Sequence, residues 1–171
     1  MTDLEQIKED FMATVGLQND AIAPIFGYLD KKGNATVLDT EIIQSLVNDH
    51  KPKMRAVLKS YLTKRLAQGE DIDTIFFFSE VYYKKVTPEE ATELKKEYIG
   101  LANDNLAEEA ILIYTESKST LKQVMHSIYY NSKDDSRYVD KTPTEICNME
   151  TDSEEFKEVL THGQLVGFLP R

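Results

Sequence analysis

Hydrophobic residues recur with helical spacing through much of the chain. The strongest case lies between Pro52 and Gly69, where the apolar positions share one helical face. These positions are Met54, Val57, Leu58, Tyr61, Leu62 and Leu66. Proline is favoured in the first turn of a helix, and glycine is favoured just after its last residue. The pattern therefore predicts a helix over residues 52–68.

Capping residues predict further helices. Thr2 and Glu5 have the spacing of a capping box, in which each side chain bonds the backbone N–H of the other residue. The helix that they open is expected to stop at Gly16. Polar caps followed by apolar stripes predict four more helices, at residues 20–29, 39–48, 105–130 and 154–162.

A proline-containing start signal occurs twice. Thr87-Pro88-Glu89-Glu90 combines an N-cap, a first-turn proline and a capping glutamate, and it predicts a helix to about Gly100 or Asn103. Thr142-Pro143-Thr144-Glu145 repeats the signature. Both segments are therefore expected to begin helices.

Residues 72–86 fit two kinds of secondary structure. Ile75-Phe76-Phe77-Phe78 and Val81-Tyr82-Tyr83 favour a strand by propensity. Their grouping also suits a buried helix, and the helical neighbours favour that interpretation. The sequence thus predicts an all-α fold: one compact helical domain, residues 1–171, of about eight or nine helices. A polar loop near 131–141, a short C-terminal helical segment and an apolar tail that docks on the body complete it.

Composition narrows the class of protein. A chain of 171 residues with 41% hydrophobic and 29% charged residues is typical of one globular domain. No apolar run approaches the roughly 20 residues of a bilayer span, and the N-terminus lacks the pattern of a secretory signal. The single cysteine, Cys147, fits a reducing compartment. We therefore expect a cytoplasmic protein without a membrane partner.

Residues 30–41 resemble the twelve-residue calcium loop of the EF-hand family. Four residues match the family pattern: Asp30, Asn34, Val37 and Glu41. Lys32 stands where a ligand oxygen is expected, and Ala35 replaces the glycine of the sharp turn. The resemblance implies a degenerate, unpaired helix-loop-helix over about 22–47, and no metal site is predicted. A sensor or scaffold of this type is one alternative function.

Basic residues concentrate in the predicted helix 52–68 and its first flanking residue. Six of them lie between residues 51 and 69, with no acidic residue among them: Lys51, Lys53, Arg55, Lys59, Lys64 and Arg65. The whole chain has a net charge of −10, so the charge is segregated. Acidic neighbours within the domain explain such a helix most simply. A binding face for an acidic protein partner is the functional interpretation, with these six residues as the candidate site.

Nucleic acid is disfavoured as a partner by the net charge of −10. Two alternatives nevertheless involve it. Residues 39–68 have the layout of a helix-turn-helix, although the turn lacks a glycine. The excess of carboxylates also permits an acidic inhibitor that mimics nucleic acid.

Signatures of catalysis are missing from the sequence. His50, His126 and His162 lie far apart and in no metal or di-iron motif, and no nucleotide loop or nucleophile elbow is present. We therefore predict no catalytic residue, no metal and no cofactor. The expected function is that of a non-enzymatic interaction or regulatory protein acting through protein–protein contacts, and the sequence does not indicate its oligomeric state.

Overall fold

The computed structural model describes residues 3–17, 22–38, 51–83, 89, 108–131, 133, 136–161 and 169. These residues form three helices and one seven-stranded sheet. The helices are α1 (Asp3–Leu17), α3 (Lys51–Ala67) and α5 (Glu154–Thr161). The strands are β1 (Ile25–Leu29), β2 (Ala35–Val37), β3 (Thr74–Tyr83), β4 (Glu108–Ser117), β5 (Thr120–Asn131), β6 (Ser136–Val139) and β7 (Thr144–Glu150).

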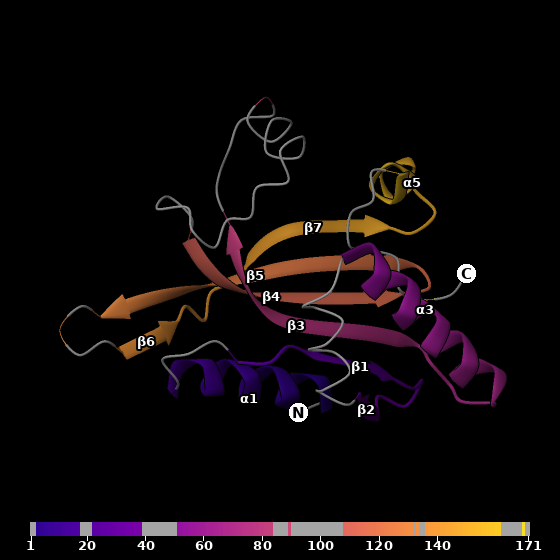
Figure 1. Cartoon of the computed structure of the whole chain (residues 1–171), viewed down its shortest axis with the longest axis horizontal. Coiled ribbons are helices and arrows are strands. Elements are labelled where there is room, and N and C mark those ends of the chain that lie inside the picture. The colour runs from indigo at the N-terminus through magenta and orange to yellow at the C-terminus, as the bar shows by residue number, and fades with distance from the viewer. Residues whose placement is uncertain are drawn as a thin grey trace.

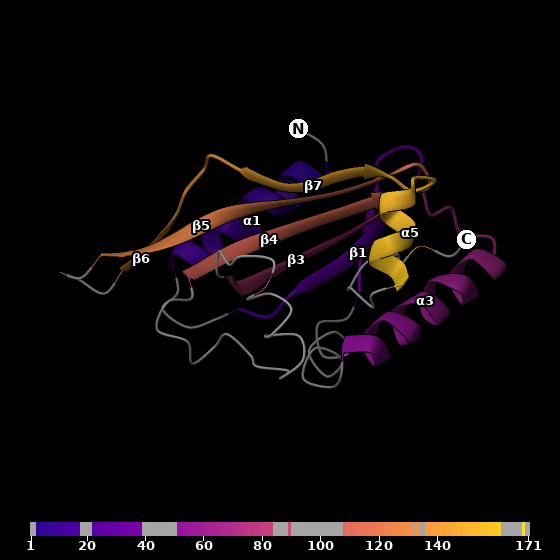
Figure 2. The same cartoon turned by 90° about the horizontal axis from the view of Figure 1, so that it is seen from above.

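All strand pairs of the sheet are antiparallel, in the order β2-β1-β3-β4-β5-β6, and β7 also pairs with β5. The long central strands β3 and β4 pair over their full lengths, from Thr74 opposite Ser117 to Tyr83 opposite Glu108. The sheet lies between α1 on one side and α3 with α5 on the other (Figures 1 and 2). The far ends of β5 and β6 project from the body as a hairpin.

Helices cover both faces of the sheet, and successive β3 residues serve opposite cores. Phe76 and Phe78 pack with Phe11 and Val15 of α1. Ile75 and Phe77 pack in the other core, where α3 and α5 contribute the buried side chains Leu58, Leu62 and Phe156. Each of these buried side chains contributes roughly 1.5–3 kcal/mol of hydrophobic stabilisation. The two helical layers therefore enclose the sheet.

The expected all-α fold is wrong, because most of the regular structure described is antiparallel sheet. Residues 74–83, for which we favoured a helix, form β3. A strand with one wet face alternates between apolar and polar residues, but a strand buried on both faces reads as a continuous apolar run. The run Ile75–Phe78 is buried on both faces, so its period-two pattern is invisible in the sequence.

Several other helical predictions are also wrong. The segments expected as helices at 20–29 and 105–130 contain β1, β4 and β5. Within the expected loop 131–141, residues 136–139 form β6. The second proline signature, which includes Pro143, precedes the strand β7 and does not begin a helix. The strand β7 lies at the border of the sheet described, so a proline just before it removes no ladder hydrogen bond.

Three helical predictions are confirmed: those from Thr2 to Gly16, over 52–68 and over 154–162 correspond to α1, α3 and α5. The expected helices at 39–48 and 87–103 lie outside the described residues, apart from Glu89. Of the apolar tail, Leu169 is described. It is buried, and its N–H donates to the Glu116 carboxylate at 3.1 Å. No helix in the described ranges is long and apolar enough to cross a membrane.

Asp30, the first residue of the calcium-loop resemblance, lies in the turn that joins β1 to β2. Its carboxylate accepts the backbone N–H groups of Lys32 and Asn34, each at 2.9 Å. Gly33 closes the turn at φ 87°, a conformation that favours glycine. The turn is flanked by strands on both sides. Glu41 lies outside the described residues, so ion binding by this loop stays untested.

Candidate functional site

Strand β5 changes its neighbour partway along its length. Its residues Thr120–Met125 pair with β7, and its residues Ile128–Asn131 pair with β6. The chain segment 140–143 passes from β6 to β7 beside the junction, at His126 and Ser127. A pocket lies beside this junction, between the border of the sheet and α1.

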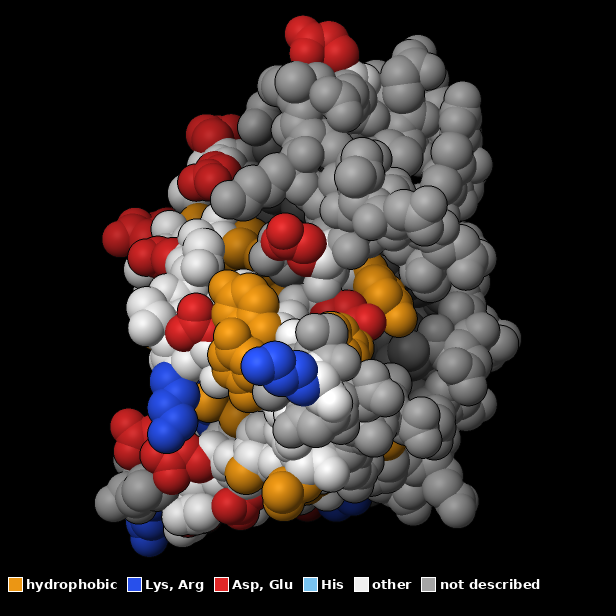
Figure 3. Space-filling view, turned by 90° about the vertical axis from the view of Figure 1, so that its left-hand side faces the viewer, with side chains coloured by type: hydrophobic (Ala, Val, Ile, Leu, Met, Phe, Trp, Pro, Cys, Tyr) orange, Lys and Arg blue, Asp and Glu red, His pale blue; other side chains and the backbone are white. Residues whose placement is uncertain are grey.

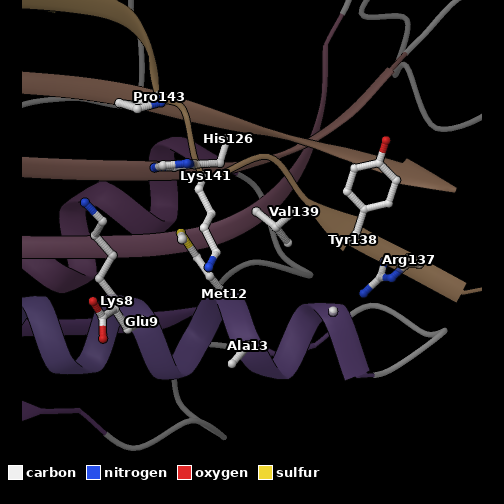
Figure 4. Close-up of a pocket in the computed structure, with 11 residues that line it drawn as sticks. Lys8, Glu9, Met12, Ala13, His126, Arg137, Tyr138, Val139, Lys141 and Pro143 are labelled. Atoms are coloured by element: carbon white, nitrogen blue, oxygen red, sulfur yellow. The ribbon is translucent and has the colours of Figure 1, made fainter.

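The pocket has a volume of about 670 Å³ and two walls of different origin. Helix α1 supplies Lys8, Glu9, Met12, Ala13 and Gly16. The sheet and the β6–β7 connection supply His126, Arg137, Tyr138, Val139, Lys141 and Pro143. Figure 4 shows Lys8 rising from α1 and Lys141 reaching down toward Met12 from the connection above. Apolar atoms form most of the lining, as is typical of small-molecule sites.

His126 is the most buried polar group at the junction, with 2% of its surface exposed. Its Nδ1 lies 2.8 Å from the backbone oxygen of Asp140. A carbonyl oxygen only accepts hydrogen bonds, so Nδ1 carries a proton and donates it. The backbone N–H of Asp140 in turn donates to the carbonyl of Ser127 at 2.8 Å. These two bonds fix the ring against the connecting segment.

The second ring nitrogen of His126, Nε2, is buried and has no hydrogen-bond partner among the described residues. Buried polar side-chain atoms in proteins are nearly always paired, and an unpaired one costs roughly 1–3 kcal/mol. In the described ranges, no group of three or more His, Cys, Asp or Glu residues is arranged to hold a metal ion. Nε2 therefore lacks described protein co-ligands for a metal, and it belongs to a residue that lines the pocket.

Two lysines give the pocket its charge. Lys8 is half-buried and Lys141 is exposed, and neither makes an ion pair within the part of the chain that is described. Glu9 is the one carboxylate among the lining residues. Together with Glu9, these two ammonium groups give the pocket a positive rim on a protein whose net charge is −10.

Arg137 also lines the pocket, but its charge is engaged elsewhere. Its guanidinium donates to Glu80 at 2.6 Å and to the carbonyl of Val15, near the end of α1, at 3.1 Å. Glu109 lies 3.8 Å away from it. Burial disfavours the charged form, but hydrogen bonds with Tyr130 and Glu80 outweigh that effect and raise the pKa of Arg137. This network fastens α1 to four strands, β3, β4, β5 and β6.

The six basic residues predicted as a binding site lie on α3, on the other side of the sheet from the pocket. The side chains of Lys51, Lys53 and Arg55 are outside the described part. Lys59 and Lys64 are exposed. Arg65 is paired within the domain, with Glu70 at 2.8 Å and with the hydroxyl of Tyr61 at 2.6 Å. The structure thus brings none of the described three into the pocket.

The residues of the pocket were missed by sequence reasoning. His126 was considered for short motifs, and its partner Asp140 is an acceptor through the main chain, which leaves no trace in residue type. Lys8 lies more than a hundred residues before His126 in the chain. The sequence did contain one signal for this site. Every second residue of this part of β5 faces α1, which places His126 on the same face as Val124 and Ile128.

The projecting hairpin carries the exposed aromatic side chains of this region. Tyr129 and Tyr138 are cross-strand partners whose ring centroids lie 5.2 Å apart. Figure 3 looks onto this end of the molecule and shows hydrophobic side chains gathered near the middle of the face, with acidic side chains beside them. Cross-strand aromatic pairs stabilise two-stranded ribbons, which explains how the hairpin holds its shape beyond the helices.

Comparison with known proteins yields no relative from which a function could be inferred. No protein-family model matches the chain, and no curated protein and no solved structure matches it significantly. The geometry of the pocket is therefore the basis on which a function can be proposed.

Proposed function

We propose that this chain is a non-enzymatic binding protein that holds a small organic anion in the pocket between α1 and the β5–β6–β7 junction. The observation that carries the proposal is the position of Lys8 and Lys141 on the rim of a mainly apolar pocket, with no ion pair to any described residue. Lysines that only make a protein soluble are not expected to lie at the same cavity when they come from two distant chain segments, as Lys8 and Lys141 do.

The size and lining of the pocket indicate the kind of molecule. A volume of about 670 Å³ falls in the range of pockets for small ligands. Met12, Val139 and Pro143 offer apolar contact to the body of the ligand. The ammonium groups of Lys8 and Lys141 favour a carboxylate or phosphate at its end. The carboxylate of Glu9 offsets one of these two charges, which leaves the three groups with a positive sum.

Thermal stabilisation by model ligands tests the proposal. Ligands that bind only the folded state raise its melting temperature as their concentration increases. Benzoate, phenyl phosphate, hexanoate and para-hydroxybenzoate at millimolar concentration provide a panel of organic anions, with benzyl alcohol as the neutral reference. We expect at least one of the anions to stabilise the protein more than benzyl alcohol does.

Matched lysine variants locate the binding. Lys8→Gln and Lys141→Gln should each reduce the stabilisation severalfold, because each removes a charge from the rim. Lys118→Gln removes an exposed lysine from the turn between β4 and β5 and should leave the stabilisation unchanged. The proposal fails if no anion of the panel stabilises the protein, or if the three variants behave alike.

A second candidate function is contact between α3 and an acidic protein. Lys59 and Lys64 are exposed on the helix and make no ion pair within the described ranges, and this observation favours it. A captured partner, identified by mass spectrometry, should be lost with the double variant Lys59→Glu/Lys64→Glu and retained with Lys118→Glu. Retention by both variants would exclude this face.

A further inference from the structure

We infer that the ligand of the pocket carries a hydrogen-bond donor, such as a hydroxyl group, in addition to its anionic group, and that this donor bonds Nε2 of His126. The inference rests on the proposed function, because it assigns the chemical class of the molecule bound at the same site: a hydroxy-substituted organic acid with an apolar body.

The hydrogen bond at Nδ1 sets the tautomer of the neutral His126 ring. Nδ1 is committed as a donor, because its partner at 2.8 Å is the carbonyl oxygen of Asp140. In a neutral imidazole, one nitrogen carries the proton and the other has a lone pair. Nε2 of neutral His126 is therefore an acceptor. A carboxylate oxygen, which is also an acceptor, does not satisfy it, whereas an O–H or N–H group does.

No described residue around Nε2 satisfies that acceptor. Nε2 has less than 1 Å² of exposed surface, and no described protein group donates to it. A buried acceptor of this kind is completed by an ordered water or by a ligand atom. His126 lines the same pocket as Lys8 and Lys141, so a molecule held there lies beside the residue that carries Nε2. Because the buried acceptor and the two ammonium groups belong to residues of one pocket, a ligand atom is favoured over a water molecule as the partner of Nε2.

Access to Nε2 depends on the side chains that cover it. Since this nitrogen is buried, a ligand reaches it only after side chains of the pocket wall move. The wall contains three long, unbranched side chains, Lys8, Met12 and Lys141, and Figure 4 shows all three extending within the pocket. Rotamer changes of exposed side chains are fast, and the backbone around His126 need not change. Binding is therefore expected to order Lys141 as the anion pairs with it.

Ligand pairs of similar size test the inference on the unmodified protein. Isothermal titration calorimetry compares para- and meta-hydroxybenzoate with para- and meta-methoxybenzoate, which lack the donor. We expect at least one hydroxybenzoate to bind about tenfold more tightly than its methoxy counterpart, the worth of one good buried hydrogen bond. In the variant His126→Phe, which has no ring acceptor, this preference should disappear while weak binding of the carboxylates persists.

The outcomes distinguish the inference from the proposed function on which it rests. If no benzoate of the set binds, the proposed function fails together with the inference. If hydroxy and methoxy compounds bind the wild-type protein equally, the inference is wrong although the proposed function stands. Titrations in buffers of different ionisation enthalpy add a further criterion. Proton uptake on binding would show that a charged His126 ring contacts the anion directly, which also overturns the inference. If His126→Phe does not fold, the comparison of hydroxybenzoates with methoxybenzoates on the wild-type protein still decides whether the inference is correct.

Discussion

Nδ1 of His126 donates to the backbone oxygen of Asp140 across 2.8 Å, while Nε2 of the same ring has no partner among the described residues. The ring thus contributes one hydrogen bond to the fold and one buried nitrogen that no described residue pairs with. For stability these two effects oppose each other: the bond contributes about 0.5–1.5 kcal/mol, and a buried nitrogen left without a partner costs about 1–3 kcal/mol.

The opposing effects lead to a prediction for His126→Phe. We expect its free energy of unfolding to stay within about 1 kcal/mol of the wild-type value, since the lost bond and the removed unpaired atom offset each other. Ile111, the cross-strand neighbour of His126, is the matched control. Ile111→Ala should lose about 3 kcal/mol through its cavity. Urea denaturation measures both, and an equal loss in the two variants would show that His126 is an ordinary core residue.

Arg137 is predicted to be far more important for stability. Its side chain is 2% exposed and pairs with Glu80, whose side chain is 12% exposed. Arg137→Met leaves the Glu80 carboxylate buried without its partner, and we expect a loss of about 3–5 kcal/mol in urea denaturation. The double variant Arg137→Met/Glu80→Met removes both charges and should recover part of this loss. A double variant less stable than Arg137→Met would contradict this expectation.

Two glycines are predicted to differ in their tolerance of alanine. A Cβ at Gly27 would lie 2.4 Å from the carbonyl oxygen of Thr36 and 2.6 Å from the ring of Phe76. Because the first contact is backbone, Gly27→Ala should unfold the β1–β2 region or cost more than about 3 kcal/mol. A Cβ added at Gly33 would meet no described atom within 4 Å beyond its chain neighbours, so the φ of 87° is what opposes alanine and the loss should be about 1 kcal/mol. Thermal denaturation of both variants checks the order.

The order of apolar and polar side chains along the chain explains which helices and strands could be predicted from the sequence. Helices α1, α3 and α5 were predicted because each has caps and one buried stripe, such as Leu58 and Leu62 on α3. Strand β3 was missed because α1 and α3 bury opposite faces of it, so Phe76 and Phe77 are equally apolar. Its aromatic and β-branched composition was the correct signal, and the helical neighbours were the misleading one.

The candidate site was hidden for a different reason. The pocket lies where β5 stops pairing with β7 and begins to pair with β6, near His126. Which strands pair is decided by the whole sheet, so this position could not be predicted from the local sequence. The bond that fixes His126 uses the backbone of Asp140, so no side-chain motif encodes it. Basic residues were noticed where they cluster in the chain, on α3, whereas Lys8 and Lys141 cluster only in space.

Acid stability should depend on Glu70. The hydroxyl of Tyr28 donates to its carboxylate and Arg65 pairs with it, and these bonds hold the pKa of Glu70 below its usual value of 4.5. A carboxyl group with a lowered pKa in the folded state stabilises the protein above the unfolded-state pKa, and this contribution is lost as the pH falls below it.

Removing that charge therefore has a pH-dependent effect. Glu70→Gln should be less stable than the wild type at neutral pH, and the two unfolding curves should converge as the pH falls below 4.5. Urea denaturation across the acid range measures the difference. A constant difference at every pH would show that the carboxylate charge has no part in it.

The most direct measurement of the central claim is nitrogen NMR of the histidine side chains. The chain has three histidines, and His126→Phe identifies the signal of His126. In the neutral ring of the free protein, we predict the proton on Nδ1 and a bare Nε2. We also predict that the better-binding hydroxybenzoate shifts the Nε2 resonance in the direction of a hydrogen-bonded acceptor while leaving Nδ1 nearly unchanged. A proton on Nε2, or an Nε2 resonance that does not move at saturating ligand, would contradict the claim.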